Sequence, residues 1–150
     1  MGFLGDILNI FFPRPKPTPP PPVVVPPSYI TSLLNLHNSA RPATSQLVPN
    51  TTLQKAAQSY AELMAKNSDL DHYEAGTPVD RARQAGYNST YVGENIEEGS
   101  STPEAVFNIW MKSASHHANI VNLNYKDVGF GYALSSNGTP YWCVDFGRIW

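Results

Sequence analysis

The chain has 150 residues, which predicts one domain, and nine of its 14 prolines lie between Pro13 and Pro27. Ten basic and twelve acidic side chains give a net charge of −2, and no basic run extends beyond Arg14 and Lys16, which argues against nucleic acid as a partner. The single cysteine, Cys143, excludes an internal disulfide framework, and no apolar run reaches the roughly 18 residues that a membrane-spanning helix needs.

The first 27 residues divide into two segments. Residues 1–12 are apolar at helical spacing, and they lack the basic start and small-residue cleavage site of a signal peptide. Residues 13–27 form a polyproline linker, because proline fixes φ and has no amide donor. We therefore expect residues 1–12 to be a frayed N-terminus, the remnant of a trimmed leader, or an anchor. An anchor would insert into a protein partner, a homo-oligomer or a membrane surface. The folded domain is expected over residues 28–150.

Three helices are predicted in the first part of this domain. Ser28 is the expected N-cap of the first, and Pro42 ends it. The stretch 50–67, "NTTLQKAAQSYAELMAKN", carries an apolar stripe at helical spacing. The third, 77–86, has a threonine cap, a proline at its first position and a glycine at its end.

Three titratable side chains in this part are candidates for function. His37 lies on the core-facing side of the first helix, so we expect a packed, hydrogen-bonded histidine rather than a ligand. His72 follows the second helix on a loop, a common location for a functional histidine. Glu94 lies in the brief extended piece "YVGENIEEG", and an exposed loop acid is the alternative interpretation. Glu97 and Glu98 are expected to be solvated.

In the C-terminal third, the spacing of apolar residues changes from a helical period to alternation. A capped helix begins at Pro103 and weakens across "SAS", so His116 and His117 are expected on a turn, pointing in different directions. "DVGFGYAL" and "PYWCVDFG" then alternate around Asn137-Gly138, a hairpin signal. Helices before this hairpin predict an α+β fold, an antiparallel sheet covered by helices.

Six fragments carry a family resemblance. They are "LHNSARP", the helix ending in "AELMAKN", the "DH" after it, "GENI", "WMKSASHHANI", and "VGFGYAL" with "YWCVDFG". In this order and spacing they resemble the CAP superfamily of cysteine-rich secretory, antigen 5 and plant pathogenesis-related 1 proteins. The last helix is similar to the W-M-x-S-x-x-H-x-x-N-I pattern of the bacterial SCP-like branch without disulfides. The resemblance covers residues 28–150.

The resemblance implies a fold and a site. The fold is an α-β-α sandwich, with a three- or four-stranded antiparallel sheet between helical layers and a central cleft. His72, Glu94 and His116 match the cleft residues. Many family members carry a second glutamate where this chain has Ser113, so the implied cluster is two histidines, one carboxylate and a hydroxyl. His117 stands where bacterial relatives usually carry arginine, which favours a solvent-facing ring.

The chemistry of these side chains points to a weak metal site. Two neutral imidazoles, His72 and His116, can hold zinc or another divalent cation, and Glu94 can orient an imidazole or take a proton from a bound water. Two protein ligands are fewer than the three usual in catalytic zinc centres, and the chain has no H-E-x-x-H spacing. We therefore expect weak, pH-sensitive binding.

A Ser113–His116–Glu94 hydrolase is a second interpretation of the same residues. The chain has no G-x-S-x-G turn, and no glycine-rich turn near Ser113 would supply oxyanion amides. On a helix, the Ser113 hydroxyl is expected to bond to the carbonyl one turn back.

Three functions stay open at this point. The first is a non-enzymatic module that binds a metal ion and a small ligand (a lipid, peptide or glycan) at an extracellular or displayed surface. The second is a metal-assisted hydrolase using His72, His116 and Glu94. The third is a structural display protein fixed through residues 1–12 to a larger assembly such as a particle. The retained methionine and missing signal sequence fit this interpretation, and they equally fit a domain cut from a longer secreted protein.

Overall fold

The computed structural model describes residues 24–150, so the predicted anchor and residues 13–23 of the predicted linker lie outside the described residues. In chain order the elements are α1 (Pro27–Ser39), a 3-10 helix η1 (Ala43–Ser45), β1 (Val48–Pro49), α2 (Thr51–Asn67), α3 (Pro78–Gln84), β2 (Val92–Glu98), α4 (Pro103–Lys112), α5 (Ala114–Val121), β3 (Asp127–Leu134) and β4 (Pro140–Gly147).

The sheet has four strands in the order β1-β3-β4-β2. The predicted hairpin forms β3 and β4, which pair antiparallel from Asp127↔Gly147 to Leu134↔Pro140, and β2 pairs antiparallel with the other edge of β4. The short β1 runs parallel to β3, so the sheet is mixed rather than purely antiparallel.

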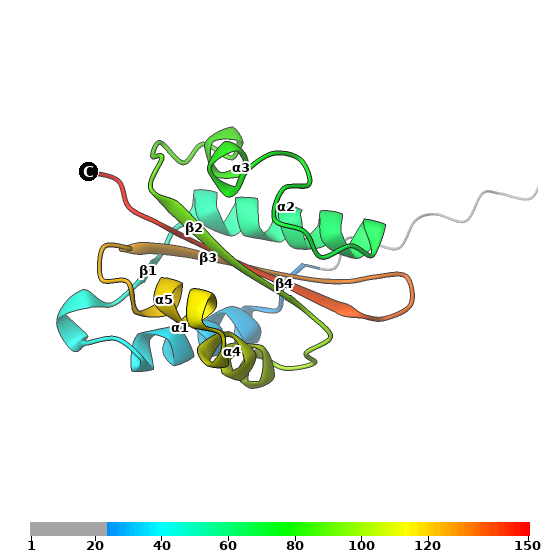
Figure 1. Ribbon diagram of the computed structural model, residues 1–150, viewed down its shortest axis with the longest axis horizontal. Coiled ribbons are helices and arrows are strands. Elements are labelled where there is room, and N and C mark those ends of the chain that lie inside the picture. Colours follow the sequence, from blue (N-terminus) through cyan, green and yellow to red (C-terminus); the bar gives the residue numbers. More distant parts are fainter. Residues whose placement is uncertain (1–23) are drawn as a thin grey trace, which may run out of the picture.

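Helices cover both faces of this sheet, as the α-β-α sandwich requires (Figure 1). The layer of α2 and α3 lies above it in that view, and α1, α4 and α5 lie below. Strand alternation divides the core accordingly. Trp142, Val144 and Phe146 pack with the lower helices, whereas Tyr141 and Cys143 pack with α2. Within residues 24–150, no helix is long and apolar enough to cross a membrane.

Helix α2 approaches β3 almost to backbone contact. A Cβ at Gly129 would lie 2.2 Å from the Leu53 carbonyl carbon, and one at Gly131 would lie 2.1 Å from the Ala57 oxygen. These two glycines face α2, so their missing side chains set the distance between the helical layer and the sheet.

Two glutamines of α2 bond to the free side of β3. Because β1 covers only Asp127 and Val128, the outward amide and carbonyl groups of Phe130 and Tyr132 have no strand beside them. Gln54 accepts from the Phe130 amide at 3.0 Å and donates to its carbonyl. Gln58 does the same at Tyr132, with both distances 3.0 Å. The side-chain amides therefore take the place of a neighbouring strand.

The domain begins earlier than the predicted residue 28. Val25 is buried in the core, and α1 starts at Pro27 with Pro26 rather than Ser28 as its N-cap. The physical reason is that proline suits the first helical position, where no amide donor is needed. Residues 25–27, predicted as linker, are therefore part of the folded domain.

Two predictions for later parts of the chain are also wrong. His116 and His117 lie in helix α5 rather than on a turn, because the chain is helical again after the extended Ser113, and Ile120 anchors that short helix in the core. Glu97 is buried rather than solvated, since helices cover β2 on both faces, and its carboxylate accepts from the Ser100 hydroxyl at 2.9 Å. Burial raises the pKa of Glu97.

The prediction for His37 is confirmed. Its ring is fully buried, Nδ1 lies 2.8 Å from the Leu33 carbonyl oxygen, and four aromatic rings surround it. The histidine is part of the core and not of a metal site.

Candidate functional site

Three separate elements bring the site together on the α2/α3 side of the sheet. His72 lies on the loop after α2, Glu94 lies on β2, and Arg81 comes from α3. Helix α3 is short, and a capping box between Thr77 and Asp80 fixes its start. Pairing of β2 with β4 places the Glu94 side chain opposite Asp145.

Glu94 is held at both carboxylate oxygens. Oε1 lies 2.8 Å from Nδ1 of His72, and Oε2 lies 2.5 Å from an Nη of Arg81. Its side chain is 1% exposed, whereas that of His72 is 39% exposed. Because a carboxylate is an acceptor only, the His72 Nδ1–H donates, and the lone pair of Nε2 is left for another partner. The predicted pairing of His72 with Glu94 is therefore present.

Arg81 connects the site to the loop that carries His72. It donates to the His72 carbonyl at 2.8 Å and to the Gly76 carbonyl at 2.6 Å, and its guanidinium lies 3.4 Å from the Tyr60 ring centroid. It is buried, with Glu94 as its ionic partner. Arginine thus fixes both the carboxylate and the histidine backbone.

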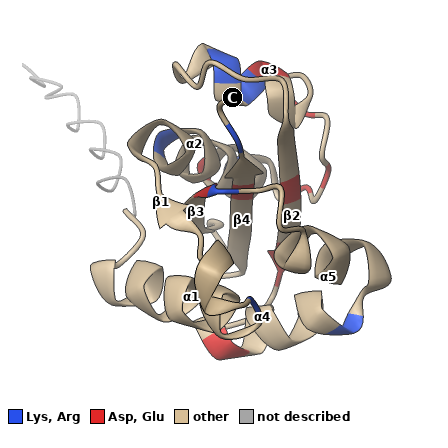
Figure 2. Ribbon diagram, turned by 90° about the vertical axis from the view of Figure 1, so that its left-hand side faces the viewer, with Lys and Arg blue, Asp and Glu red and all other residues tan. Residues whose placement is uncertain are grey.

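Asp145 is a second buried carboxyl group at this position. Figure 2 shows acidic residues in both β2 and β4, and the pairing register puts Asp145 beside Glu94. Burial first, and then the charge of Glu94, raise the pKa of Asp145 well above its usual value, although Arg81 opposes this. Asp145 Oδ2 has no donor partner in the described chain, so a protonated carboxyl that donates to Glu94 fits the site better than a second anion.

His116 lies in α5, in the opposite helical layer, near enough to His72 to interact with it electrostatically. Its backbone carbonyl accepts from the Asn95 side chain at 3.0 Å, and Asn119 in turn donates to Asn95 Oδ1 at 2.8 Å, which ties α5 to β2. Burial and, to a lesser extent, the charge of His72 lower the pKa of His116, so its ring is neutral at pH 7. Its buried Nδ1 has no partner within residues 24–150.

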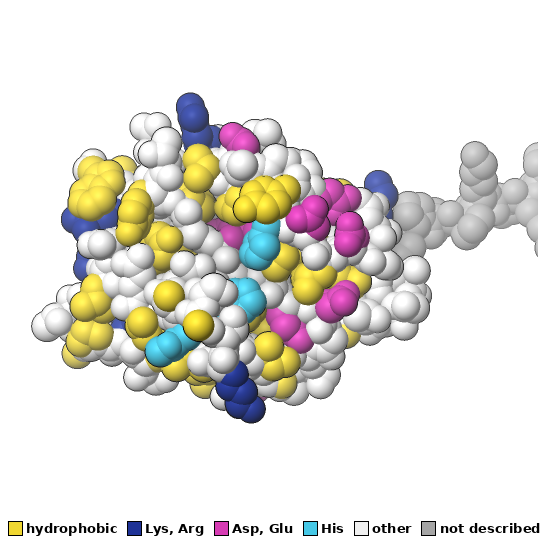
Figure 3. Space-filling model, in the orientation of Figure 1, with side chains coloured by type: hydrophobic (Ala, Val, Ile, Leu, Met, Phe, Trp, Pro, Cys, Tyr) yellow, Lys and Arg dark blue, Asp and Glu magenta, His cyan; other side chains and the backbone are white. Residues whose placement is uncertain are grey.

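The surface over these residues is partly apolar. Figure 3 shows histidine side chains exposed near the middle of this face, with hydrophobic surface beside them and acidic side chains gathered to one side. Tyr73 is exposed, and its ring centroid lies 6.3 Å from that of His72. His117 is only half-buried in α5, so its ring is partly in solvent.

Ser113 does not join the histidines. It has an extended conformation between α4 and α5, and its Oγ lies 3.3 Å from Ser115 Oγ rather than bonding to a carbonyl one turn back. No hydrogen bond connects it to His116 or Glu94 in the part of the chain that the structure describes. The extended backbone at Ser113 is the physical reason that the predicted intrahelical bond is absent.

The order of helices and strands agrees with a known family. The model of the CAP family, described as the cysteine-rich secretory protein family, matches residues 34–146. The chain belongs to the CAP family.

One CAP relative matches a little over half of this chain. The uncharacterized protein YkwD of Bacillus subtilis (strain 168) is 36% identical over 88 residues, which are 57% of this chain and 34% of that protein. The chain therefore spans about a third of that relative's length.

Solved CAP-like structures confirm the fold. An outer surface protein of Borrelia burgdorferi superposes with a TM-score of 0.77 at 21% identity, over 86% of this chain and 99% of that one. The crystal structure of NaASP2 with Zn²⁺ gives a TM-score of 0.62 at 13% identity, over 81% of this chain and 80% of that one. The α-β-α sandwich implied by the resemblance is confirmed.

Two clusters of side chains in this CAP domain contain atoms that could bind a metal ion. Glu94, Cys143 and Asp145 present ligand atoms within 4.8 Å of one another. A cation does not fit there, because Arg81 already supplies the positive charge, and burial raises the pKa of the Cys143 thiol well above its usual value. His72 and His116 fit better, since one has a lone pair left by its carboxylate partner and the other has an unpartnered nitrogen.

Sequence reasoning missed four residues of the site: Tyr60, Arg81, Cys143 and Asp145. The sequence does contain a signal for Asp145, because a charged residue at an inward position of an otherwise apolar alternating strand is unusual. The sequence contains no such signal for Arg81, because a basic residue near the end of a short capped helix is usually solvated.

Proposed function

We propose that this CAP domain is an extracellular or surface-displayed binding module whose His72/His116 cleft takes a divalent metal ion, zinc foremost, together with a small ligand. The observation that carries the proposal is the 2.8 Å contact between His72 Nδ1 and Glu94. A carboxylate on one imidazole nitrogen is the usual arrangement behind a metal-binding histidine, because it fixes the tautomer and raises the basicity of the other nitrogen.

A bound metal ion would supply positive charge at the two imidazoles. The chain's own residues hold these side chains in place: Glu94 orients His72, Arg81 fixes Glu94, and Asn95 fixes the backbone at His116. The apolar surface beside the histidines, which includes Tyr73, favours a ligand with an apolar part, such as a lipid or an apolar peptide.

The hydrogen bonds and burial of Glu94 favour a binding function over hydrolysis. Both of its oxygens already have partners and its side chain is almost fully buried, so it is poorly placed to take a proton from water. Ser113 makes no contact that would activate it as a nucleophile among the residues described.

Calorimetric titration with zinc tests the proposal. We expect weak binding that is lost in both His72→Ala and His116→Ala, and that weakens about 10-fold to 100-fold in Glu94→Gln. His117→Ala is the matched control, because that histidine is adjacent in α5 and should leave affinity unchanged. Binding that survives either of the first two substitutions would show that the histidines do not share one ion.

An assay with peptide and ester libraries separates the binding module from the hydrolase. We expect no turnover with or without zinc. Turnover that disappears in Glu94→Gln, in protein whose unfolding midpoint is unchanged, would establish the enzyme in place of the binding module.

A further inference from the structure

The loop between α2 and α3, residues 68–77, carries His72 and contains no helix or strand. Among residues 24–150, neither Asp71 nor His72 makes a hydrogen bond between its own backbone and another backbone group. A loop without such bonds samples several conformations unless side chains fix it. The position of His72 therefore depends on side-chain donors from the neighbouring helices.

Tyr60 of α2 supplies one of these donors. Its hydroxyl donates to the carbonyl oxygen of Asp71, the residue directly before His72. The side chain is buried, and burial raises the pKa of the Tyr60 phenol above its usual value, so the hydroxyl stays protonated at neutral pH. The protonated phenol is the form that can donate to a carbonyl.

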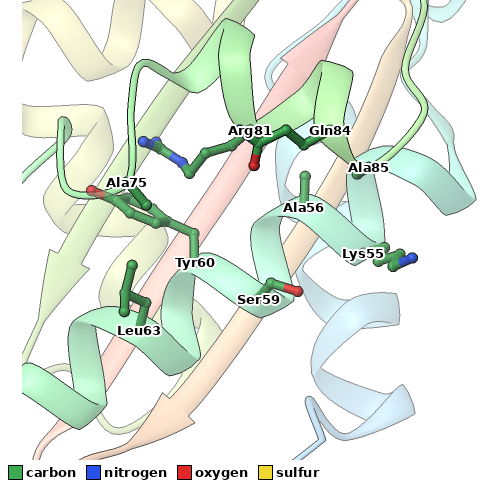
Figure 4. A pocket seen from close by; sticks show the side chains of 9 residues that line it. All are labelled: Lys55, Ala56, Ser59, Tyr60, Leu63, Ala75, Arg81, Gln84 and Ala85. Atoms are coloured by element: carbon green, nitrogen blue, oxygen red, sulfur yellow. The ribbon is translucent and has the colours of Figure 1, made fainter.

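The ring of Tyr60 supports a second donor. Figure 4 shows the Arg81 side chain, from α3, extending over the Tyr60 ring, and both line the hollow between the two helices. The guanidinium lies 3.4 Å from the ring centroid, where the ring quadrupole attracts a cation. Arg81 in turn donates to the His72 carbonyl at 2.8 Å and to the Glu94 carboxylate. Tyr60 therefore acts on His72 directly, through Asp71, and indirectly, through Arg81.

A purely structural role is the alternative for Tyr60, which also packs in the core cluster beneath α2 with Met64 and Cys143. That packing needs the ring but not the hydroxyl. Within the described residues, the hydroxyl's hydrogen bond is the one to the Asp71 carbonyl. Because Asp71 is exposed, its carbonyl can bind water instead, so this bond adds little to the stability of the fold. Its effect is on the position of the loop.

We propose that Tyr60 is a positioning residue for His72. It holds the loop so that the Nδ1–H of His72 meets Glu94 and Nε2 stays free for a metal ion. The consequence for metal affinity rests on the function proposed above. The placement of the ring is a property of the metal-free protein, so the two proposals can fail separately.

Long-range nitrogen–proton NMR spectra of the metal-free full chain test the placement. The two tautomers of a neutral imidazole give different ring-nitrogen shifts, and the contact with Glu94 requires the Nδ1–H form. We expect this form to dominate in the wild-type protein at mildly alkaline pH, with the signals assigned by their loss in His72→Ala. Tyr60→Phe should lower its population, because the loop is no longer held at Asp71.

Tyr87→Phe is the matched control. Tyr60 and Tyr87 are each 1% exposed, and the Tyr87 hydroxyl donates to Asp127 at 2.6 Å instead of to the His72 loop. Both substitutions remove one hydroxyl from a buried ring. Tyr87→Phe should leave the His72 tautomer and the zinc affinity unchanged.

Calorimetric titration with zinc measures the consequence for binding. Tyr60→Phe should weaken zinc binding about threefold to tenfold, as expected for one hydrogen bond, with the unfolding midpoint nearly unchanged. Tyr60→Leu also removes the ring beneath Arg81, so it should weaken binding about 10-fold to 100-fold. Its unfolding midpoint should be lower, because a large buried ring is lost, and it is titrated below that midpoint.

Three results would overturn the proposal. One is the same His72 tautomer population in wild type and Tyr60→Phe. Another is a change of equal size in Tyr87→Phe, which would make the effect a general result of losing a buried hydroxyl. The third is equal zinc affinity in wild type and Tyr60→Phe. A wild-type protein that binds no zinc would contradict the metal site instead, and the tautomer spectra would still decide the role of Tyr60.

Discussion

At the residue scale, Glu94 and Asp145 are two buried carboxyl groups on paired strands, and the Arg81 guanidinium contacts Glu94. Because burial and Glu94 raise the pKa of Asp145, the folded protein keeps a proton there that the unfolded chain releases above its usual pKa near 4. The stability contributed by this proton is fully present below the usual pKa. It decreases as the pH rises from there through the raised pKa of Asp145 in the fold.

Asparagine is a close mimic of the protonated form of Asp145. We expect Asp145→Asn to keep a donor toward Glu94 and to leave the free energy of unfolding at pH 7 unchanged or higher. Asp145→Ala should lower it by about 1–3 kcal/mol, because it removes that donor beside a buried carboxylate. Urea unfolding of both variants measures this, and equal losses would show that Asp145 is ionised in the fold.

His37 gives a pH dependence of the opposite sign. Burial lowers the pKa of His37 to about 4, whereas an unfolded histidine titrates near 6.5. Between these values the unfolded state binds more protons, so the fold loses stability as pH falls, by up to about 3 kcal/mol. His37→Leu should flatten this slope.

Urea midpoints at about pH 4.5 and about pH 6.5 measure the slope for His37. The substitution also removes packing, so the comparison is between slopes and not between absolute stabilities. Wild type and His37→Leu with the same slope would contradict the assignment.

At the element scale, helix α2 packs closely on strand β3. A Cβ at Gly131 would lie 2.1 Å from the backbone oxygen of Ala57, which cannot rotate away. We expect Gly131→Ala to cost about 3 kcal/mol in thermal or urea unfolding. Gly138 lies in the hairpin turn at φ +84° with open space around it, so Gly138→Ala should cost only about 1 kcal/mol.

The ratio of these two costs distinguishes overpacking from backbone strain. Equal losses at Gly131 and Gly138 would mean that α2 shifts away from β3 without penalty.

Elements with a strong local pattern were predictable from the sequence, and the others were not. The alternation around Asn137-Gly138 predicted β3 and β4 with their observed bounds, because a two-residue period on a buried sheet leaves little freedom of register. Helix α5 was missed because eight residues with no side-chain cap carry no local signal, and packing of Ile120 stabilises them instead.

The candidate site was predictable only as far as single motifs allowed. His72 and Glu94 were singled out by their positions in the chain and matched to the cleft by the family resemblance, and the structure joins them at 2.8 Å. Arg81 and Asp145 depend on the position of α3 over β2 and on the register Glu94↔Asp145, which are tertiary properties that no short window contains.

At the scale of the whole molecule, Arg41 ties one helical layer to the end of the sheet. From the end of α1 it donates to the carbonyls of Ser45, Ile120, Asn122 and Tyr125, at 2.8–2.9 Å. Arg41→Lys keeps the charge but cannot reach this set of acceptors, so we expect it to cost about 2–3 kcal/mol.

Guanidinium chloride unfolding measures this cost, with Arg83→Lys as the control. Arg83 is exposed on α3, so its substitution should change stability by no more than about 0.5 kcal/mol. A loss at Arg41 as small as that at Arg83 would mean that the four carbonyls find other donors.

The glutamines of α2 also affect how copies of the protein behave toward one another. An open strand edge is a template on which a second molecule can add its own strand and begin to aggregate. Gln54 and Gln58 occupy that template from within the same chain. We therefore expect replacement of both glutamines by leucine to increase self-association at high concentration before it changes the fold.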